Sequence, residues 1–149
     1  MSTYRNLVEY SFDYPASTVT RANGGYSATD TEVVGRWVQM QGNVPLLVGD
    51  DVRPDGIIKS LGATKVGIAF GPILTGKQSG DTVIPAGRFA TGATRTVTNG
   101  GTPERGFVKA LPASLTTVAH AVSAKGRIIN SGTNTADTEG EANTDVLMW

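Results

Sequence analysis

The segment PDGIIKSLGATKVGIAFGP, residues 54–72, holds two short apolar runs between turn-forming residues. The runs are Gly56–Leu61 and Lys65–Phe70, and they contain the Ile and Val side chains that favour strands. Pro54-Asp55-Gly56 opens the first run, and Gly71-Pro72 follows the second. Gly supplies positive φ, Pro restricts φ, and Asp hydrogen-bonds its own backbone, so these residues favour turns. The segment therefore predicts two β-strands bounded by turns.

The same alternation of short β runs and turns continues along most of the chain. Its 149 residues are one domain's worth, 19 of them are Gly, and only 17% are charged. This composition predicts a mainly β fold, as a small β-barrel, a sandwich or a more open tulip-like arrangement. Thr98-Asn99-Gly100-Gly101 is the strongest hairpin signal. The other expected strands are Glu32–Gln39, Pro45–Val48, Asp81–Ile84, Arg88–Ala90, Arg95–Thr98, Gly106–Ala110, Arg127–Asn130 and Asp145–Trp149.

One short helix is expected after the last of the central strands. Pro112 suits the first turn of a helix, and Lys125-Gly126 suits its end. A polar loop, Ser131–Thr144, separates the last two expected strands. The apolar residues that recur at the helical spacing i, i+3, i+4 and i+7 are Leu115, Val118, Ala119 and Val122.

The first 30 residues differ from the rest because they are rich in aromatic side chains. They are expected to form an extended N-terminal arm, with residues 31–149 as the β-rich domain. Alternation from Val8 to Tyr14 places four apolar side chains on one face of an extended segment. Two interpretations stay open: a first strand packed on its own domain, or an arm whose aromatic face docks on a neighbour.

The chain's C-terminal end, Met148-Trp149, is apolar and costly to leave in water, so it is expected to pack on this domain or on a neighbour. The residues predicted to bind a partner are Tyr4, Leu7, Val8, Tyr10, Phe12, Tyr14 and Trp149.

The closest approach to a catalytic motif is the stretch Gly71–Gln78, GPILTGKQ, which has the Gly-x4-Gly-Lys spacing of a phosphate-binding loop. Gln78 stands where Ser or Thr must hold Mg²⁺, and the next residues indicate a turn and a strand instead of a helix. A Gly-rich β turn is therefore the preferred interpretation.

Other chemistry-bearing residues are few. His120 is the only histidine, the chain has no cysteine, and the helical neighbours of His120 offer no carboxylate. Asp50, Asp51 and Asp55 form the densest acidic cluster but lack the Ca²⁺-loop signature, so turn capping is the better interpretation. We expect no catalytic residue, cofactor or metal site, and therefore no enzyme.

Charge and hydropathy exclude further classes of partner. The 13 basic and 13 acidic residues balance, whereas nucleic-acid binders usually carry a basic excess. No apolar run approaches the ~20 residues of a membrane helix, and the N-terminus lacks the apolar stretch of a signal peptide. Nucleic-acid and membrane partners are not expected.

The turn-and-strand series from Pro45 to Phe89, together with the tail, resembles bacteriophage capsid decoration (head cement) proteins. The phrases that carry the resemblance are Leu46-Leu47-Val48-Gly49-Asp50-Asp51-Val52, Lys65-Val66-Gly67-Ile68-Ala69-Phe70, Ser79-Gly80-Asp81-Thr82-Val83-Ile84-Pro85-Ala86-Gly87, Gly126-Arg127-Ile128-Ile129-Asn130-Ser131-Gly132 and Asp145-Val146-Leu147-Met148.

The resemblance implies a structural virion protein on the outer capsid surface, made in the host cytoplasm. Such proteins bind the expanded head, often as trimers at local three-fold positions, and clamp neighbouring subunits, commonly with an N-terminal arm on the shell. The implied partners are the major capsid protein and further copies of the chain as a homotrimer. The chain departs from the minimal cement module in its longer, more aromatic N-terminal part, so residues 1–44 either add a docking element or follow another plan.

Three alternatives remain. The chain could be another phage structural component, such as a tail tube, fibre or baseplate domain. It could be a carbohydrate-binding β-domain whose exposed platforms are Tyr4, Tyr10, Tyr14 and Tyr26. A hydrolase that uses Asp50 or Asp51 ranks lowest.

Overall fold

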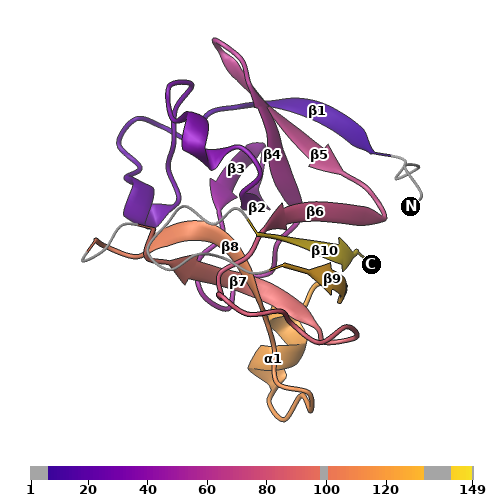
Figure 1. Ribbon diagram of the computed structural model, residues 1–149. Helices are drawn as coiled ribbons and strands as arrows, with labels where there is room; N and C mark the ends of the chain where they lie inside the picture. The colour runs from indigo at the N-terminus through magenta and orange to yellow at the C-terminus, as the bar shows by residue number, and fades with distance from the viewer. Residues whose placement is uncertain (1–6, 98–100, 133–141, 149) are drawn as a thin grey trace.

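The computed structural model describes residues 7–97, 101–132 and 142–148, and this part of the chain is mainly β (Figure 1). The predicted fold class is therefore confirmed. The strands are β1 Val8–Asp13, β2 Trp37–Gln41, β3 Val44–Leu47, β4 Gly56–Leu61, β5 Lys65–Phe70, β6 Ile73–Lys77, β7 Ala90–Arg95, β8 Glu104–Ala110, β9 Arg127–Ser131 and β10 Asn143–Leu147. The helical elements are α1 Val118–Ser123 and the 3-10 turns η1 Arg21–Asn23 and η2 Thr31–Val33.

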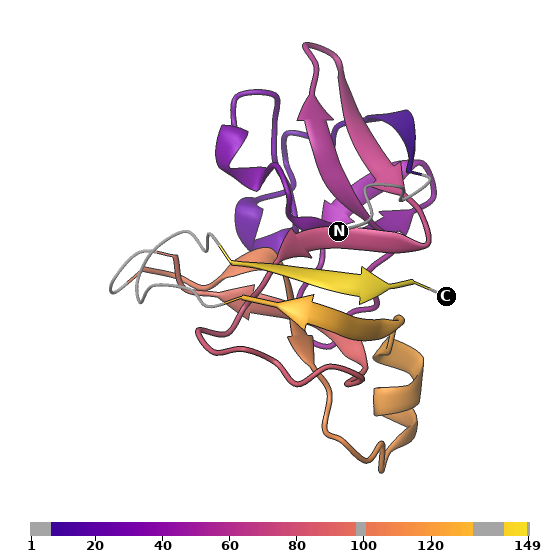
Figure 2. The ribbon, with the colours of Figure 1, turned by 45° about the vertical axis from the view of Figure 1, so that its right-hand side comes forward.

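The strands form antiparallel sheets of five, three and two strands. Their orders are β1-β5-β4-β2-β3, β6-β10-β9 and β7-β8. Figure 2 shows the five-stranded sheet above the stacked strands β6, β10 and β9, with α1 projecting below them. Within the described residues no sheet closes on itself, so the arrangement is consistent with a sandwich and not with a closed barrel.

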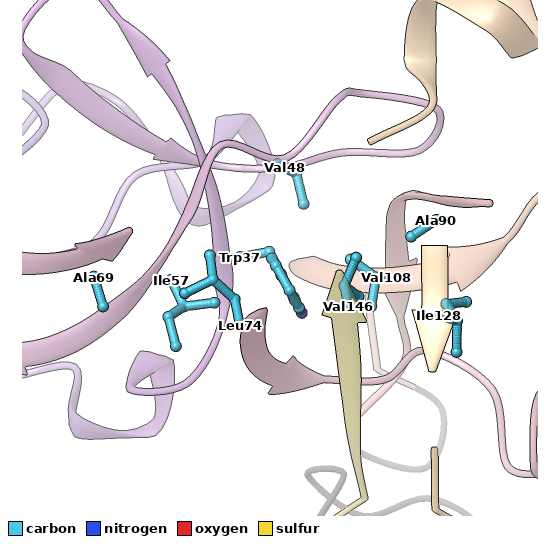
Figure 3. Close-up of a cluster of buried hydrophobic side chains, with 9 residues drawn as sticks. All are labelled: Trp37, Val48, Ile57, Ala69, Leu74, Ala90, Val108, Ile128 and Val146. Carbon is cyan, nitrogen blue, oxygen red and sulfur yellow. The ribbon is translucent and has the colours of Figure 1, made fainter. Parts of the chain in front are cut away.

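The central part of the five-stranded sheet is buried on both faces. Successive side chains along a strand point to opposite faces, and here both faces are apolar. The central core, drawn in Figure 3, contains Trp37, Val48, Ile57, Ala69, Leu74, Ala90, Val108, Ile128 and Val146. The second core, here called the N-terminal core, contains Tyr26, Val33, Val38, Leu47, Ile58, Val66 and Ile68. Neighbouring residues divided between the two cores are Trp37/Val38, Leu47/Val48, Ile57/Ile58 and Ile68/Ala69.

Trp37 joins two sheets through close packing against β6. Its side chain is fully buried, and its Nε1 donates to the Lys77 carbonyl at 3.2 Å. Gly76 lies so close to the indole that an added Cβ would be 2.4 Å from Nε1 and 2.5 Å from Cε2. Gly76 is thus required by the bulk of Trp37, not by a phosphate group.

The connection from β1 to β2 is held to the body by Arg21. Its guanidinium lies 3.2 Å from Asp30 and 2.7 Å from Glu32, both within the connection. It also lies 2.8 Å from Glu104 on β8. The Arg21 side chain therefore links the connection between β1 and β2 to β8.

The same connection contributes to the N-terminal core. Tyr26 is 6% exposed, and its hydroxyl donates to the Pro45 carbonyl at 2.9 Å. Burial raises the pKa of Tyr26, so the hydroxyl stays protonated as a donor. The Leu47 amide donates to the Gly24 carbonyl at 3.0 Å, which fixes the connection along β3.

Several expected strands differ in extent. The structure has the expected Gly56–Leu61 and Lys65–Phe70, but the Glu32–Gln39 run begins as the 3-10 turn η2 and becomes a strand only at Trp37. The prediction for Asp81–Ile84 is wrong because side chains hold this backbone outside any ladder: Arg95 lies 2.7 Å from the Asp81 carboxylate.

The two short strands expected at Arg88–Ala90 and Arg95–Thr98 are replaced by the single strand β7. Gly92, at its centre, donates its amide to the Val52 carbonyl at 2.8 Å, an approach that a side chain would prevent. The turn expected at Thr98-Asn99-Gly100-Gly101 lies largely outside the described residues, although β7 and β8 on either side of it pair as expected of a hairpin.

The helix is shorter than its apolar pattern predicts, and the apolar face is not buried. The Thr117 hydroxyl accepts from the His120 amide at 3.1 Å, so the helix begins at Val118 and Pro112 lies outside it. Val118 is 79% exposed and Val122 is 68% exposed. Helical spacing identified the element but not its environment.

Replacing Gly76 with Ala is expected to lower the free energy of unfolding by about 1–3 kcal/mol, because the new methyl group overlaps the Trp37 indole. Urea unfolding followed by Trp fluorescence measures the change. Gly80→Ala is the matched control, since an added Cβ there meets no atom within 4 Å. Equal losses in the two variants would show that the Trp37 contact is not responsible.

Acid destabilisation is expected to depend on Glu32. Burial alone would raise the pKa of Glu32, but the hydrogen bond and charge of Arg21 hold it below its ordinary value. The ionised carboxylate therefore stabilises the fold above the ordinary pKa, and this contribution is lost as pH falls through the lowered one. Between about pH 7 and about pH 3, the melting temperature of Glu32→Gln should fall less than that of the parent. In an Arg21→Gln background, Glu32→Gln should change the profile less, because only a backbone hydrogen bond then still lowers the pKa of Glu32; an undiminished effect there would contradict the assignment to this pair.

Candidate docking surface

β1 is an edge strand with one open side. All of its residues pair with β5, from Val8 opposite Phe70 to Asp13 opposite Lys65. Within residues 7–97, 101–132 and 142–148, no strand is hydrogen-bonded to the other side of β1, although β3 approaches β1, and Asn43 lies beside its last residues. The outward N–H and C=O groups at the start of β1 are therefore available to an added strand.

Exposed apolar side chains gather at the start of β1. Leu7, Val8 and Tyr10 are 43%, 46% and 58% exposed. The Tyr10 ring lies 6.2 Å from the partly buried ring of Phe70 on β5. We call Leu7, Val8, Tyr10 and Phe70 the apolar corner. Aromatic and aliphatic side chains of this kind form the centres of protein interfaces.

The remaining aromatic residues of the N-terminal pattern serve the fold. Phe12 packs edge-on against Phe70 with ring centroids 6.1 Å apart. Tyr14 lies 6.0 Å from Tyr26, and its hydroxyl donates to the Gly62 carbonyl at 2.7 Å. The stripe of four predicted residues therefore divides into an exposed start and a packed end.

The two acidic residues of β1 are directed along their own sheet. The Glu9 carboxylate accepts from the Ser60 hydroxyl at 3.0 Å, across the backbone of Gly67. An added Cβ at Gly67 would lie 2.3 Å from this carboxylate, so the glycine makes room for it. Asp13 forms an ion pair with Lys65 of β5. Neither carboxylate is left to repel a strand at the open edge.

The C-terminal strand ends beside the turn that follows the apolar corner. The Met148 amide donates to the Pro72 carbonyl at 2.7 Å, and Leu147 of β10 pairs with Ile73 of β6. Figure 1 shows the start of β1 and the end of β10 on the same side of the molecule. Tyr4 and Trp149, the other predicted partner-binding residues, lie outside the described residues.

Of the two interpretations of the N-terminal segment, the structure has the ordinary first strand over residues 8–13. Docking of residues 1–30 on a neighbouring molecule stays a prediction. Phe70 was not among the predicted docking residues. Its signal in the sequence is an aromatic residue that ends an apolar strand directly before Gly71-Pro72.

The acidic cluster near the second strand pair is occupied by structural contacts. Asp50 accepts from the Thr94 amide at 2.8 Å, and Asp55 accepts from the Met40 amide at 2.9 Å. Asp51 lies 3.1 Å from the Lys109 ammonium. These carboxylates hold loops to strands, so the prediction of local turn capping is wrong: their partners are distant in sequence.

The phosphate-loop spacing does not correspond to a loop. Residues 73–77 are the strand β6 where the pattern predicts a turn, and Gln78 is fully buried. The Gln78 amide nitrogen donates to the carbonyls of Gly80, Thr82 and Gly132, and its oxygen accepts from Thr144. The Gln78 side chain therefore holds the loop after β6 and the end of β9 in place through their main-chain carbonyls.

An open hollow of about 530 Å³ lies between Tyr14, Tyr26 and the connection around Arg21 and Asp30. Its two tyrosine hydroxyls and the Asp30 carboxylate already have partners inside the protein. Tyr26 is buried and so cannot serve as the exposed platform that a carbohydrate site requires. The hollow gives little support to glycan binding.

The described residues form neither a metal-binding cluster nor a membrane-spanning helix. None of their His, Asp and Glu side chains form a group of three or more that could hold a metal ion. Among the same residues, no helix is long and apolar enough to cross a membrane.

Comparisons with protein-family models, curated proteins and solved structures found no match to this chain.

Substitutions in β1 should separate the docking role from the folding role. Tyr10→Ser is expected to change the free energy of unfolding by less than about 1 kcal/mol, because the side chain is mostly exposed. Phe12→Ser should cost about 2–3 kcal/mol, because Phe12 packs on the N-terminal core. Chemical denaturation of the two variants measures both values. A large loss for Tyr10→Ser would mean that this residue serves the fold.

Proposed function

We propose that this protein is a structural component of a bacteriophage virion that binds the outer surface of the capsid and cements neighbouring major capsid subunits. The observation that carries the proposal is the open edge of β1 beside the apolar corner. An extended strand of a capsid subunit can add to this edge through main-chain hydrogen bonds, while Val8 and Tyr10 supply apolar contact.

The rest of the molecule suits a role based on many modest contacts. The sheet that carries β1 is anchored by two cores, so the docking edge is held on a rigid body. Symmetric repetition over a capsid multiplies weak contacts into large avidity. The proposed partners are the major capsid protein and further copies of this chain, as a homotrimer at local three-fold positions on the outer capsid surface.

A capsid add-back experiment tests the proposal. Purified protein is mixed with expanded heads that lack it, and occupancy and the thermal rupture temperature of the heads are recorded. The parent should bind saturably and raise the rupture temperature. The double variant Val8→Thr/Tyr10→Ser should bind at least about tenfold more weakly, which corresponds to about 1.4 kcal/mol. Deleting residues 1–14 is a poorer variant, because it removes β1 and exposes the edge of β5.

The matched control is Val118→Thr/Val122→Ser, which changes two exposed apolar residues on α1, an element outside the five-stranded sheet. It should bind as the parent does. If the parent binds under no salt condition, the cement proposal fails. If both double variants lose binding equally, the assignment to β1 fails. Spontaneous polymerisation of the pure protein would point to a tail-tube component.

A further inference from the structure

Residues 81–86, in the connection from β6 to β7, lie outside every sheet. Main-chain bonds fix this connection on either side: the Ser79 amide donates to the Val108 carbonyl at 2.9 Å, and the Gly87 amide donates to the Ile128 carbonyl at 2.7 Å. Between these two points, no main-chain group of residues 81–86 is bonded to another main-chain group of the described residues. We call residues 81–86 the strap, and Figure 2 shows it as an irregular trace below β9.

Side chains of the body take the place of the missing main-chain bonds. The Ser131 hydroxyl, at the end of β9, accepts from the Ile84 amide at 2.6 Å and donates to the Ile84 carbonyl at 3.3 Å. One serine thus supplies both of the bonds that a residue in a neighbouring strand would supply. At the start of the strap, Arg95 lies 2.7 Å from the Asp81 carboxylate.

Gln78 also holds the strap, but its bond to the strap can be lost at little cost. Its Nε2 carries two hydrogens and has three carbonyl acceptors, those of Gly80, Thr82 and Gly132. If Thr82 moves away, Gly80 and Gly132 still accept, and Thr144 still donates to the side-chain oxygen. The buried amide is therefore not left without partners, which is the expensive outcome for a polar group.

Few other contacts oppose opening of the strap. Ile84 is its one side chain that packs on the central core, and it is only partly buried. Val83 is 59% exposed. The Asp81 side chain is 53% exposed, so its ion pair with Arg95 stabilises the closed strap only weakly. Segments with so few buried apolar contacts and main-chain bonds open at a much lower free energy than the whole domain unfolds.

We propose that the strap opens as one unit while the sheets stay folded, and that the bonds between Ser131 and Ile84 hold it closed. Opening turns Ile84 out beside the already exposed Val83, so the open form presents a flexible apolar segment that the closed form covers in part. The main-chain bonds on either side of the strap limit the movement to this segment. The inference does not depend on the proposed function, because it concerns the isolated chain and does not involve β1.

Hydrogen exchange of individual amides, followed by NMR spectroscopy, tests the inference. The Ile84 amide should exchange more slowly than the Val83 amide, which has no partner among the described residues. It should exchange at least about a hundredfold faster than the Ile58 amide, which is bonded to Arg36 inside the five-stranded sheet. Low concentrations of urea should hardly change the Ile84 rate, because opening exposes little surface.

Three variants separate opening of the whole strap from fraying at one residue. Ser131→Ala should speed exchange of the Ile84 amide by about fivefold or more, because it removes the hydroxyl that the amide binds. Asp81→Asn, three positions before Ile84, should speed the same amide by about two- to fivefold, because it weakens the other end of the unit. Thr82→Ser is the matched control: it lies nearer to Ile84, and its exposed side chain should leave the rate unchanged. Unchanged exchange of the Ile58 amide shows that each variant keeps its fold.

Three results would overturn the inference. Equal rates and equal urea dependence for the Ile84 and Ile58 amides would mean that the strap opens only when the whole domain unfolds. Equal exchange of the Ile84 and Val83 amides in the parent would mean that Ser131 does not hold the strap closed. An Asp81→Asn variant with the same Ile84 rate as Thr82→Ser would mean that the strap does not open as one unit.

Discussion

Packing of the Trp37 indole against the bare backbone of Gly76 joins the five-stranded sheet to the three-stranded sheet. The indole occupies the centre of a core to which strands of all three sheets contribute (Figure 3). Because the opposite face of the five-stranded sheet is covered by the N-terminal core, that sheet offers no broad face to a partner. A partner strand would therefore meet this sheet at an edge, and exposed apolar side chains lie on the edge strand β1.

The polar groups of the interior follow the same logic. Arg36 and Gln78 are fully buried, yet each is placed where it serves the backbone or a carboxylate. Arg21 draws Glu32 and Glu104 together and so ties the long connection after β1 to β8. The polar side chains of Arg21, Arg36 and Gln78 thus hold loops and strands in place.

The two edge strands of the five-stranded sheet differ: β3 is protected, whereas β1 is open at its start. Pro45 and the bond from Leu47 to Gly24 close one side, while β1 keeps its main-chain groups available. The same feature that permits docking creates a hazard of self-association in the free protein.

The sequence by itself determined the mainly β class and the two strands Gly56–Leu61 and Lys65–Phe70, because turn residues bound them on both sides and local chemistry sufficed. It also identified the alternation of β1 but not the division between exposed Tyr10 and packed Phe12, which depends on where Phe70 lies. Only the tertiary structure decided that Gly76 belongs to a strand, since its role is set by Trp37, 39 positions away in the sequence. The exposure of α1 was likewise beyond the pattern: helical spacing reports which side chains share a face, whereas burial depends on what the rest of the chain places against it.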